Sequence, residues 1–159
     1  MMPKRTNEFQ QLIYAINLQL AKEATVTESK LLRHRLTGAE REVDVVIEIE
    51  IGPYRPIIGI ECRAHERPQD VEWVEQAHTK HKHLTDKLVL VSQSGFTPQA
   101  KNLAKTLGIE TLTLAGAEKV DWTQIVGKLT RVYIALVRGQ PTQIGILPKY
   151  SLKNNFLLF

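Results

Sequence analysis

Three ionisable residues of one predicted hairpin, Asp44, Glu61 and Arg63, have the types and spacing that metal and phosphate chemistry uses. Side chains alternate between the two faces of a strand, so Glu61 and Arg63 are expected to point the same way. A tight turn at Gly52 and Pro53 would place Asp44 directly across from Glu61, and a longer loop would shift this pairing by about one residue. Either register brings two carboxylates close together.

Two neighbouring carboxylates repel each other, and a cation between them offsets that cost. A hard divalent ion such as Mg²⁺ takes one or two carboxylates together with waters and phosphate oxygens, and it lowers the pKa of a bound water. The pattern therefore indicates that Asp44 and Glu61 hold a metal ion, while Arg63 orients a phosphate or stabilises developing charge. The alternative is a solvated face, shared with Glu48 and Glu50, that carries only weak cross-strand ion pairs.

The elements expected to carry this hairpin begin with an amphipathic helix at residues 7–22, whose apolar residues repeat at helical spacing. Alternating and β-branched residues then predict an antiparallel three-stranded meander over residues 24–63. In its central strand the odd positions from Val43 to Ile51 are expected to share one core face. A capped helix is predicted over residues 70–83.

The second half of the chain predicts a parallel unit. Residues 87–92 are nearly all apolar, as in a strand covered on both faces. A helix with N-cap Thr97 and stop signal Gly108 follows, and residues 109–114 return as a strand, which implies a right-handed crossover.

The end of the chain is less regular. Residues 118–128 predict a further helix, and residues 131–138 fit either a strand or a helix. A chain of 159 residues suffices for one well-buried core. We expect one domain over residues 1–129, with Trp73 and Trp122 packed inside it. Residues 130–159 would be a C-terminal extension that packs on the domain or mediates association.

The composition, 43% hydrophobic and 24% charged, is that of a globular protein. No run approaches about 18 apolar residues, and "MMPKRTNEF" lacks an apolar signal core, so we expect no membrane association and a cytoplasmic location. The single cysteine, Cys62, cannot form an internal disulfide and is expected to pack as a small hydrophobe. The net charge of +4 is compatible with a polyanionic partner.

The segment "HTKHKH" gathers His78, His81 and His83, which raises the question of a zinc site. No cysteine cluster or matching acidic partner accompanies these histidines, which argues against zinc. The same segment carries Lys80 and Lys82, which could contact the phosphates of a nucleic acid or simply complement the helix dipole.

The segments "REVDVVI", with Asp44, and "GIECRAH", with Glu61 and Arg63, resemble the PD-(D/E)xK nuclease superfamily. The closest resemblance is to its Mrr-type and Holliday-junction-resolvase-like branches. The order of elements and the segment "LVLVSQSGFTPQAKNLAKTLGIETL" also match, so the resemblance spans about residues 7–114. It implies a restriction-endonuclease-like α/β sandwich with a mixed central sheet: a helix, an antiparallel meander, a helix and a parallel βαβ unit. Residues 1–129 would form this nuclease domain.

The resemblance further implies a metal-dependent DNA endonuclease that acts as a homodimer. Asp44 and Glu61 would be ligands of Mg²⁺, or of Mn²⁺, and the main-chain carbonyl of Cys62 would be a third ligand. Arg63 stands where the family has a lysine. Arginine keeps its charge and can hold a phosphate, but it is a far poorer proton acceptor than lysine.

Other family positions are matched less closely. Glu8 or Gln10 would take the place of a glutamate that many members carry on the first helix. Gln76 resembles the first residue of the Mrr-type Gln-x-x-x-Tyr motif, with Lys80 at the tyrosine position, and Lys80 and Lys82 are candidate contacts to the DNA backbone. Two alternatives stay open: a catalytically inactive member that binds DNA or a protein partner, and an unrelated α/β domain with a charged hairpin.

Overall fold

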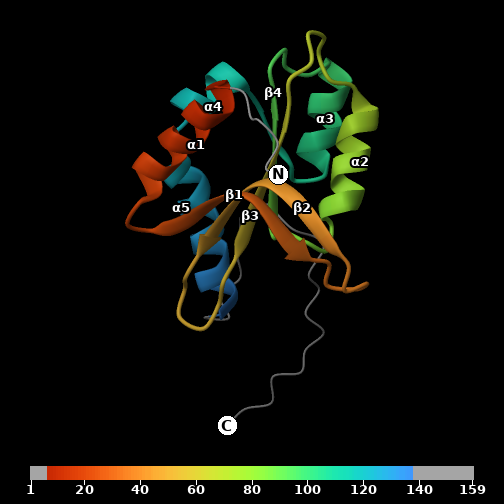
Figure 1. Ribbon diagram of the computed structural model, residues 1–159. Helices are drawn as coiled ribbons and strands as arrows, with labels where there is room; N and C mark the ends of the chain where they lie inside the picture. The colour runs from red at the N-terminus through yellow and green to blue at the C-terminus, as the bar shows by residue number, and fades with distance from the viewer. Residues whose placement is uncertain (1–6, 138–159) are drawn as a thin grey trace.

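The computed structural model describes residues 7–137, which form a five-stranded sheet between two layers of helices (Figure 1). The strand order is β1-β2-β3-β4-β5. Strands β1 to β3 form an antiparallel meander, and β4 and β5 run parallel to β3. The strands are β1 (Ala24–Arg33), β2 (Glu40–Ile49), β3 (Ile57–Arg63), β4 (Lys87–Ser92) and β5 (Glu110–Thr113). The helices are α1 (Asn7–Leu20), α2 (Val71–His81), α3 (Pro98–Thr106), α4 (Leu114–Lys119) and α5 (Trp122–Val137).

Helices α1, α4 and α5 cover one face of the sheet, and α2 and α3 cover the other (Figure 1). The apolar stripe of α1 is buried on the first face, together with Trp122 of α5. Trp73 of α2 is buried on the second face against the apolar side chains of β4 and α3. The predicted α/β sandwich with a mixed sheet is therefore confirmed, and so is the interior position of both tryptophans.

A two-residue turn joins β2 to β3, as the sequence predicts. Ile51 and Tyr54 exchange two backbone hydrogen bonds of 3.0 Å, and Gly52 has φ of +57°. Such tight hairpin turns need a positive φ, which glycine adopts without strain. The resulting register pairs Val45 with Ile60 at the end of the ladder, so Asp44 and Glu61 lie just beyond this last pair on neighbouring strands.

The regular alternation of β2 is interrupted at Asp44, next to this pair. Val45 packs in the core beneath α1, whereas Val43 packs with Val46, a residue that strict alternation would place on the opposite face. The prediction that Val43 shares a core face with Val45 is therefore wrong. The facing strand is irregular at the same level, since Ser29 has φ of +52° and the register passes from Glu28↔Val45 to Lys30↔Val43.

Near the end of the described chain, the sequence predicts one helix where the structure has two. Residues 118–128 do not form one helix, because α4 ends at Lys119 and α5 begins at Trp122. Asp121 lies between them, and its carboxylate accepts a hydrogen bond from the backbone N–H of Thr123. A side chain that accepts from the backbone in this way favours a helix start.

Helix α5 continues to Val137, which settles that part of residues 131–138 as helix. Residues 138–159 of the expected extension lie outside the described residues, so its role stays a prediction. No helix within residues 7–137 is both long and apolar enough to cross a membrane.

Candidate active site

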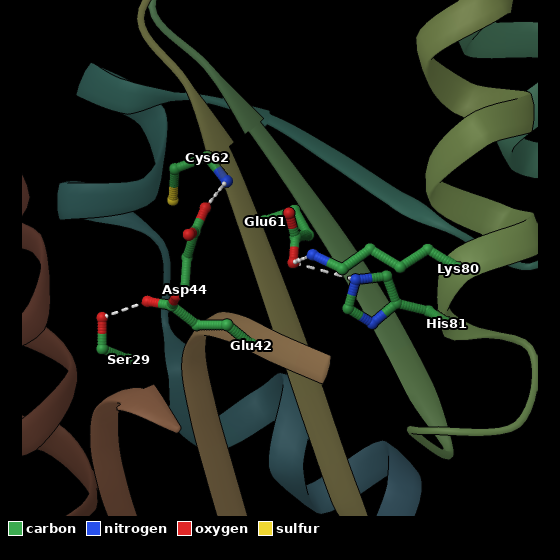
Figure 2. Close-up of polar contacts among 7 residues, drawn as sticks. All are labelled: Ser29, Glu42, Asp44, Glu61, Cys62, Lys80 and His81. Atoms are coloured by element: carbon green, nitrogen blue, oxygen red, sulfur yellow. Dashed lines mark hydrogen bonds and ion pairs between the residues drawn. The ribbon is translucent and has the colours of Figure 1, made fainter. Parts of the chain in front are cut away.

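Asp44 is held at the seam between β2 and β3. Its half-buried carboxylate oxygen Oδ2 accepts a hydrogen bond of 2.9 Å from the backbone N–H of Cys62, and Figure 2 shows the side chain directed toward that amide. Hydrogen bonding to the charged form of a carboxylate stabilises that form. The contact therefore fixes an acidic oxygen beside the strand that carries Glu61.

Glu61 is held by two cationic or polar groups of α2. Its oxygen Oε1 accepts hydrogen bonds from Lys80 Nζ at 2.7 Å and from His81 Nε2 at 2.9 Å (Figure 2). The side chain of Glu61 is only 15% exposed. Burial acts to raise the pKa of this carboxyl group, but the hydrogen bonds and charges of His81 and Lys80 outweigh it, so the pKa lies below its ordinary value. Glu61 is therefore held as a carboxylate.

Gly59 explains why α2 lies close enough to reach Glu61. Gly59 and Glu61 are two residues apart on β3 and so face the same side of the sheet. A Cβ atom at Gly59 would lie 2.6 Å from Cγ2 of buried Thr85 and 3.3 Å from Nδ1 of His81. The missing side chain thus makes room for the end of α2 and for the residues that follow it.

Arg63 contacts a different part of α2. Its guanidinium carbon lies 4.6 Å from the centre of the Trp73 ring, and Nη1 donates a hydrogen bond of 3.3 Å to Gln69. The Trp73 ring stacks in turn on Phe96, with ring centres 5.6 Å apart. Trp73 is thus a platform for Arg63 as well as a core residue, and Arg63 is engaged near the start of α2, away from the Lys80 end.

The remaining predicted site residues are more dispersed. Gln76 is exposed on α2 and donates a hydrogen bond of 3.0 Å to Glu72. Lys82 is exposed at the C-cap of α2. Glu8 and Gln10 belong to α1, but their side chains lie outside the described part of the structure.

The donors at the seam suit a hard divalent cation. The carboxylates of Asp44 and Glu61 and the carbonyl of Cys62 are oxygen donors, which Mg²⁺ prefers, and Mg²⁺ commonly takes few protein ligands and fills its other positions with water and phosphate. Within residues 7–137, no group of three or more His, Cys, Asp or Glu side chains is placed to hold a metal ion. The oxygen donors of Asp44, Glu61 and Cys62 are thus of the chemical type that Mg²⁺ takes.

Sequence reasoning missed the contact of Lys80 and His81 with Glu61. The sequence suggests Lys80 only as a contact to DNA or as a complement to the helix dipole, and His81 only as part of a histidine cluster. The available signal was Gly59, since a glycine inside a buried strand often marks a close approach of another element.

The model of a restriction endonuclease catalytic family of the Mrr type matches residues 7–120. The chain belongs to this restriction endonuclease family. Its fold is accordingly the restriction-endonuclease-like fold of the PD-(D/E)xK nucleases, as the resemblance implied. The third alternative, an unrelated α/β domain, is excluded. A search of curated proteins finds no match.

Several solved structures are similar to this chain at low sequence identity. A protein of unknown function, AF1548, is 19% identical with a TM-score of 0.51, and the match covers 67% of this chain and 57% of that one. A repair endonuclease from Pyrococcus abyssi is 21% identical with a TM-score of 0.44, covering 70% and 47%. The modification-dependent restriction endonuclease AspBHI is 15% identical with a TM-score of 0.44, covering 85% and 41%. This family member thus spans about three fifths or less of the length of each of these three structures.

Proposed function

We propose that this restriction endonuclease family member is a divalent-metal-dependent DNA endonuclease of the cytoplasm that hydrolyses phosphodiester bonds. The observation that supports the proposal is that Asp44 and Glu61 lie on neighbouring strands just beyond Val45↔Ile60, the last pair of the β2–β3 ladder. Both carboxylates are held by hydrogen bonds, Asp44 by the amide of Cys62 and Glu61 by two groups of α2. A charged hairpin that served only solubility would not need this support.

In this proposal Asp44, Glu61 and the carbonyl of Cys62 hold Mg²⁺ or Mn²⁺. The bound ion would lower the pKa of a coordinated water and offset negative charge on the phosphate. The Cys62 amide keeps the Asp44 carboxylate in place, and the low pKa of Glu61 keeps it ionised near neutral pH. The positive charge of Lys80, which contacts Glu61, attracts the negatively charged phosphodiester.

The direct test is nicking of supercoiled plasmid DNA in Mg²⁺, in Mn²⁺ and in EDTA. We expect cleavage in either metal and none in EDTA. Asp44→Asn and Glu61→Gln should each lower the rate by about 10²-fold or more, since each loses a charged ligand at the reacting centre. Asparagine at position 44 can still accept the hydrogen bond from Cys62, so this change tests charge rather than folding.

Glu50→Gln is the matched control for these two substitutions. Its side chain is 74% exposed and pairs with Arg55, away from the seam. This variant should cleave at the wild-type rate. Cleavage that persists in Asp44→Asn or Glu61→Gln would contradict the proposed metal site.

The second candidate is a catalytically inactive member that binds DNA or a protein partner. The observation that favours it is Arg63, which replaces the family's lysine and is engaged with Trp73 and Gln69. DNA binding without cleavage in either metal would support this candidate over the endonuclease.

A homodimer is part of the leading proposal. One chain provides one Asp44 and Glu61 pair, and a duplex has two strands to cut. Two copies related by a twofold axis would present one pair to each strand.

A further inference from the structure

Cleavage of a phosphodiester is aided by a positively charged side chain that contacts the phosphate being cleaved. This side chain need not belong to β3. Arg63 of β3 is the sequence-predicted candidate, but its guanidinium lies over the Trp73 ring and donates to Gln69. Gln69 is itself 4% exposed and bonded through its backbone to Gly95 and Thr97. Arg63 is thus fixed in the packing between β3, the start of α2 and the segment before α3.

Lys80 is a cation in direct contact with the candidate metal ligand Glu61. Its Nζ lies 2.7 Å from Oε1 of Glu61. An ammonium group has three N–H donors, so one bond to Glu61 leaves two donors for other acceptors. The side chain of Lys80 is 34% exposed, which gives those donors access to solvent and to a substrate.

A surface cavity of about 470 Å³ opens beside Lys80. From the β1 and β2 region, His34 and Arg41 contribute to its lining. The α2 side contributes Glu75, Gln76, Thr79 and Lys80. Lys80 therefore lines an open cavity together with a second permanently charged cation, Arg41.

His81 is buried, unlike Lys80, although it contacts the same oxygen of Glu61. Its side chain is 1% exposed, and its Nδ1 has no hydrogen-bond partner. A carboxylate only accepts hydrogen bonds, so Nε2 is the donor in this contact. His81 is closed off from solvent and acts as a support for Glu61, which leaves Lys80 as the accessible cation.

We propose that Lys80 of α2 is a catalytic residue of this endonuclease, which holds Glu61 and contacts an oxygen of the scissile phosphate, and that Arg63 is a positioning residue. The proposal rests on the proposed endonuclease function. The lysine charge comes to the site from the helix that packs over β3, at the level of Glu61, and Gly59 makes that approach sterically available. Arg63 holds the end of β3 against Trp73.

The test compares Lys80→Met, Lys80→Arg and Arg63→Met in single-turnover cleavage of duplex DNA at saturating protein and Mg²⁺. Lys80→Met should lower the rate by about 10²-fold, because one preorganised charge is lost at the phosphate. Lys80→Arg should recover part of this rate, since it restores the charge. Arg63→Met should lose less than Lys80→Met. Lys105→Met, an exposed change of the same charge on α3, is the control and should match the wild type.

A second readout separates a direct role from a purely structural one. We would titrate Mn²⁺ into each folded variant without DNA and follow the heat of binding. Lys80→Met should bind Mn²⁺ at least as tightly as the wild type, since a cation that competes for Glu61 is gone, whereas Glu61→Gln should bind it more weakly. If Lys80→Met lost Mn²⁺ binding as Glu61→Gln does, Lys80 would only position Glu61, and its catalytic assignment would be overturned.

The outcomes also distinguish the two proposals. A wild-type protein that cleaves no DNA in Mg²⁺ or Mn²⁺ would overturn the endonuclease function and the role of Lys80 together. A cleaving wild type with an equally active Lys80→Met variant, or with a larger loss in Arg63→Met, would overturn the role of Lys80 alone.

Discussion

The pKa of Glu61 is set by two opposing physical effects. Burial penalises its negative charge, whereas the hydrogen bonds from His81 and Lys80 stabilise it, and the net result is a lowered pKa. Asp44, on the neighbouring strand, accepts a hydrogen bond from the backbone amide of Cys62. Each carboxylate therefore has its own hydrogen-bonding support for its charged form.

The lowered pKa of Glu61 predicts how its contribution to stability depends on pH. A carboxyl group whose pKa is lower in the folded state stabilises the fold above its unfolded pKa, and that stabilisation is lost as pH falls through the folded value. In EDTA, the unfolding free energy of the wild type should exceed that of Glu61→Gln by a constant amount above about pH 6. The difference should shrink as the pH falls below about 4.

Denaturant unfolding at several pH values measures this difference. The control is Glu50→Gln, because an exposed ion pair contributes little to stability. A wild type that gains stability over Glu61→Gln as the solution becomes more acidic would contradict the assigned direction of the pKa shift.

At the scale of elements, the site depends on how closely α2 packs on β3. The sequence predicted α2 and β3 as separate elements because helix and strand periodicities are local. It did not predict that Lys80 and His81 lie over Glu61, since the packing of a helix on a sheet depends on distant residues such as Thr85. The interruption at Asp44 was also missed, because it involves the irregular partner position Ser29 on β1.

Gly59→Ala tests this packing. The added methyl group would meet Thr85 and His81, so we expect a loss of about 1–3 kcal/mol in unfolding free energy and slower DNA cleavage. Gly127→Ala in α5 is the matched control, because its added Cβ meets nothing within 4 Å. Alanine favours a helix interior, so this variant should gain about 0.5–1 kcal/mol. Urea unfolding of both variants checks the pair, and a Gly59→Ala protein as stable as the wild type would contradict the account.

At the scale of the molecule, the sheet is covered on both faces, and the seam of β2 and β3 lies at its centre. The element order and the hairpin register were predictable, because the two-residue turn at Gly52 and the period-two pattern are short-range signals. The break between α4 and α5 was not predicted, since Asp121 and the buried Trp122 start a new helix where the apolar pattern continues.

We predict that the protein binds duplex DNA as a homodimer. Light scattering of the protein with a short duplex in Ca²⁺ should give the mass of two 18.1 kDa chains in addition to the DNA. A mass of one chain per duplex, together with cleavage of both strands at one position, would contradict a dimer as the cutting form.

The central claim is that Asp44 and Glu61 hold one catalytic metal ion. Anomalous scattering from crystals soaked in Mn²⁺ tests it most directly. We predict one strong anomalous peak within bonding distance of a carboxylate oxygen of each residue, and no such peak in Asp44→Asn crystals. Wild-type crystals without Mn²⁺ at this seam, or with Mn²⁺ bound only elsewhere, would contradict the claim.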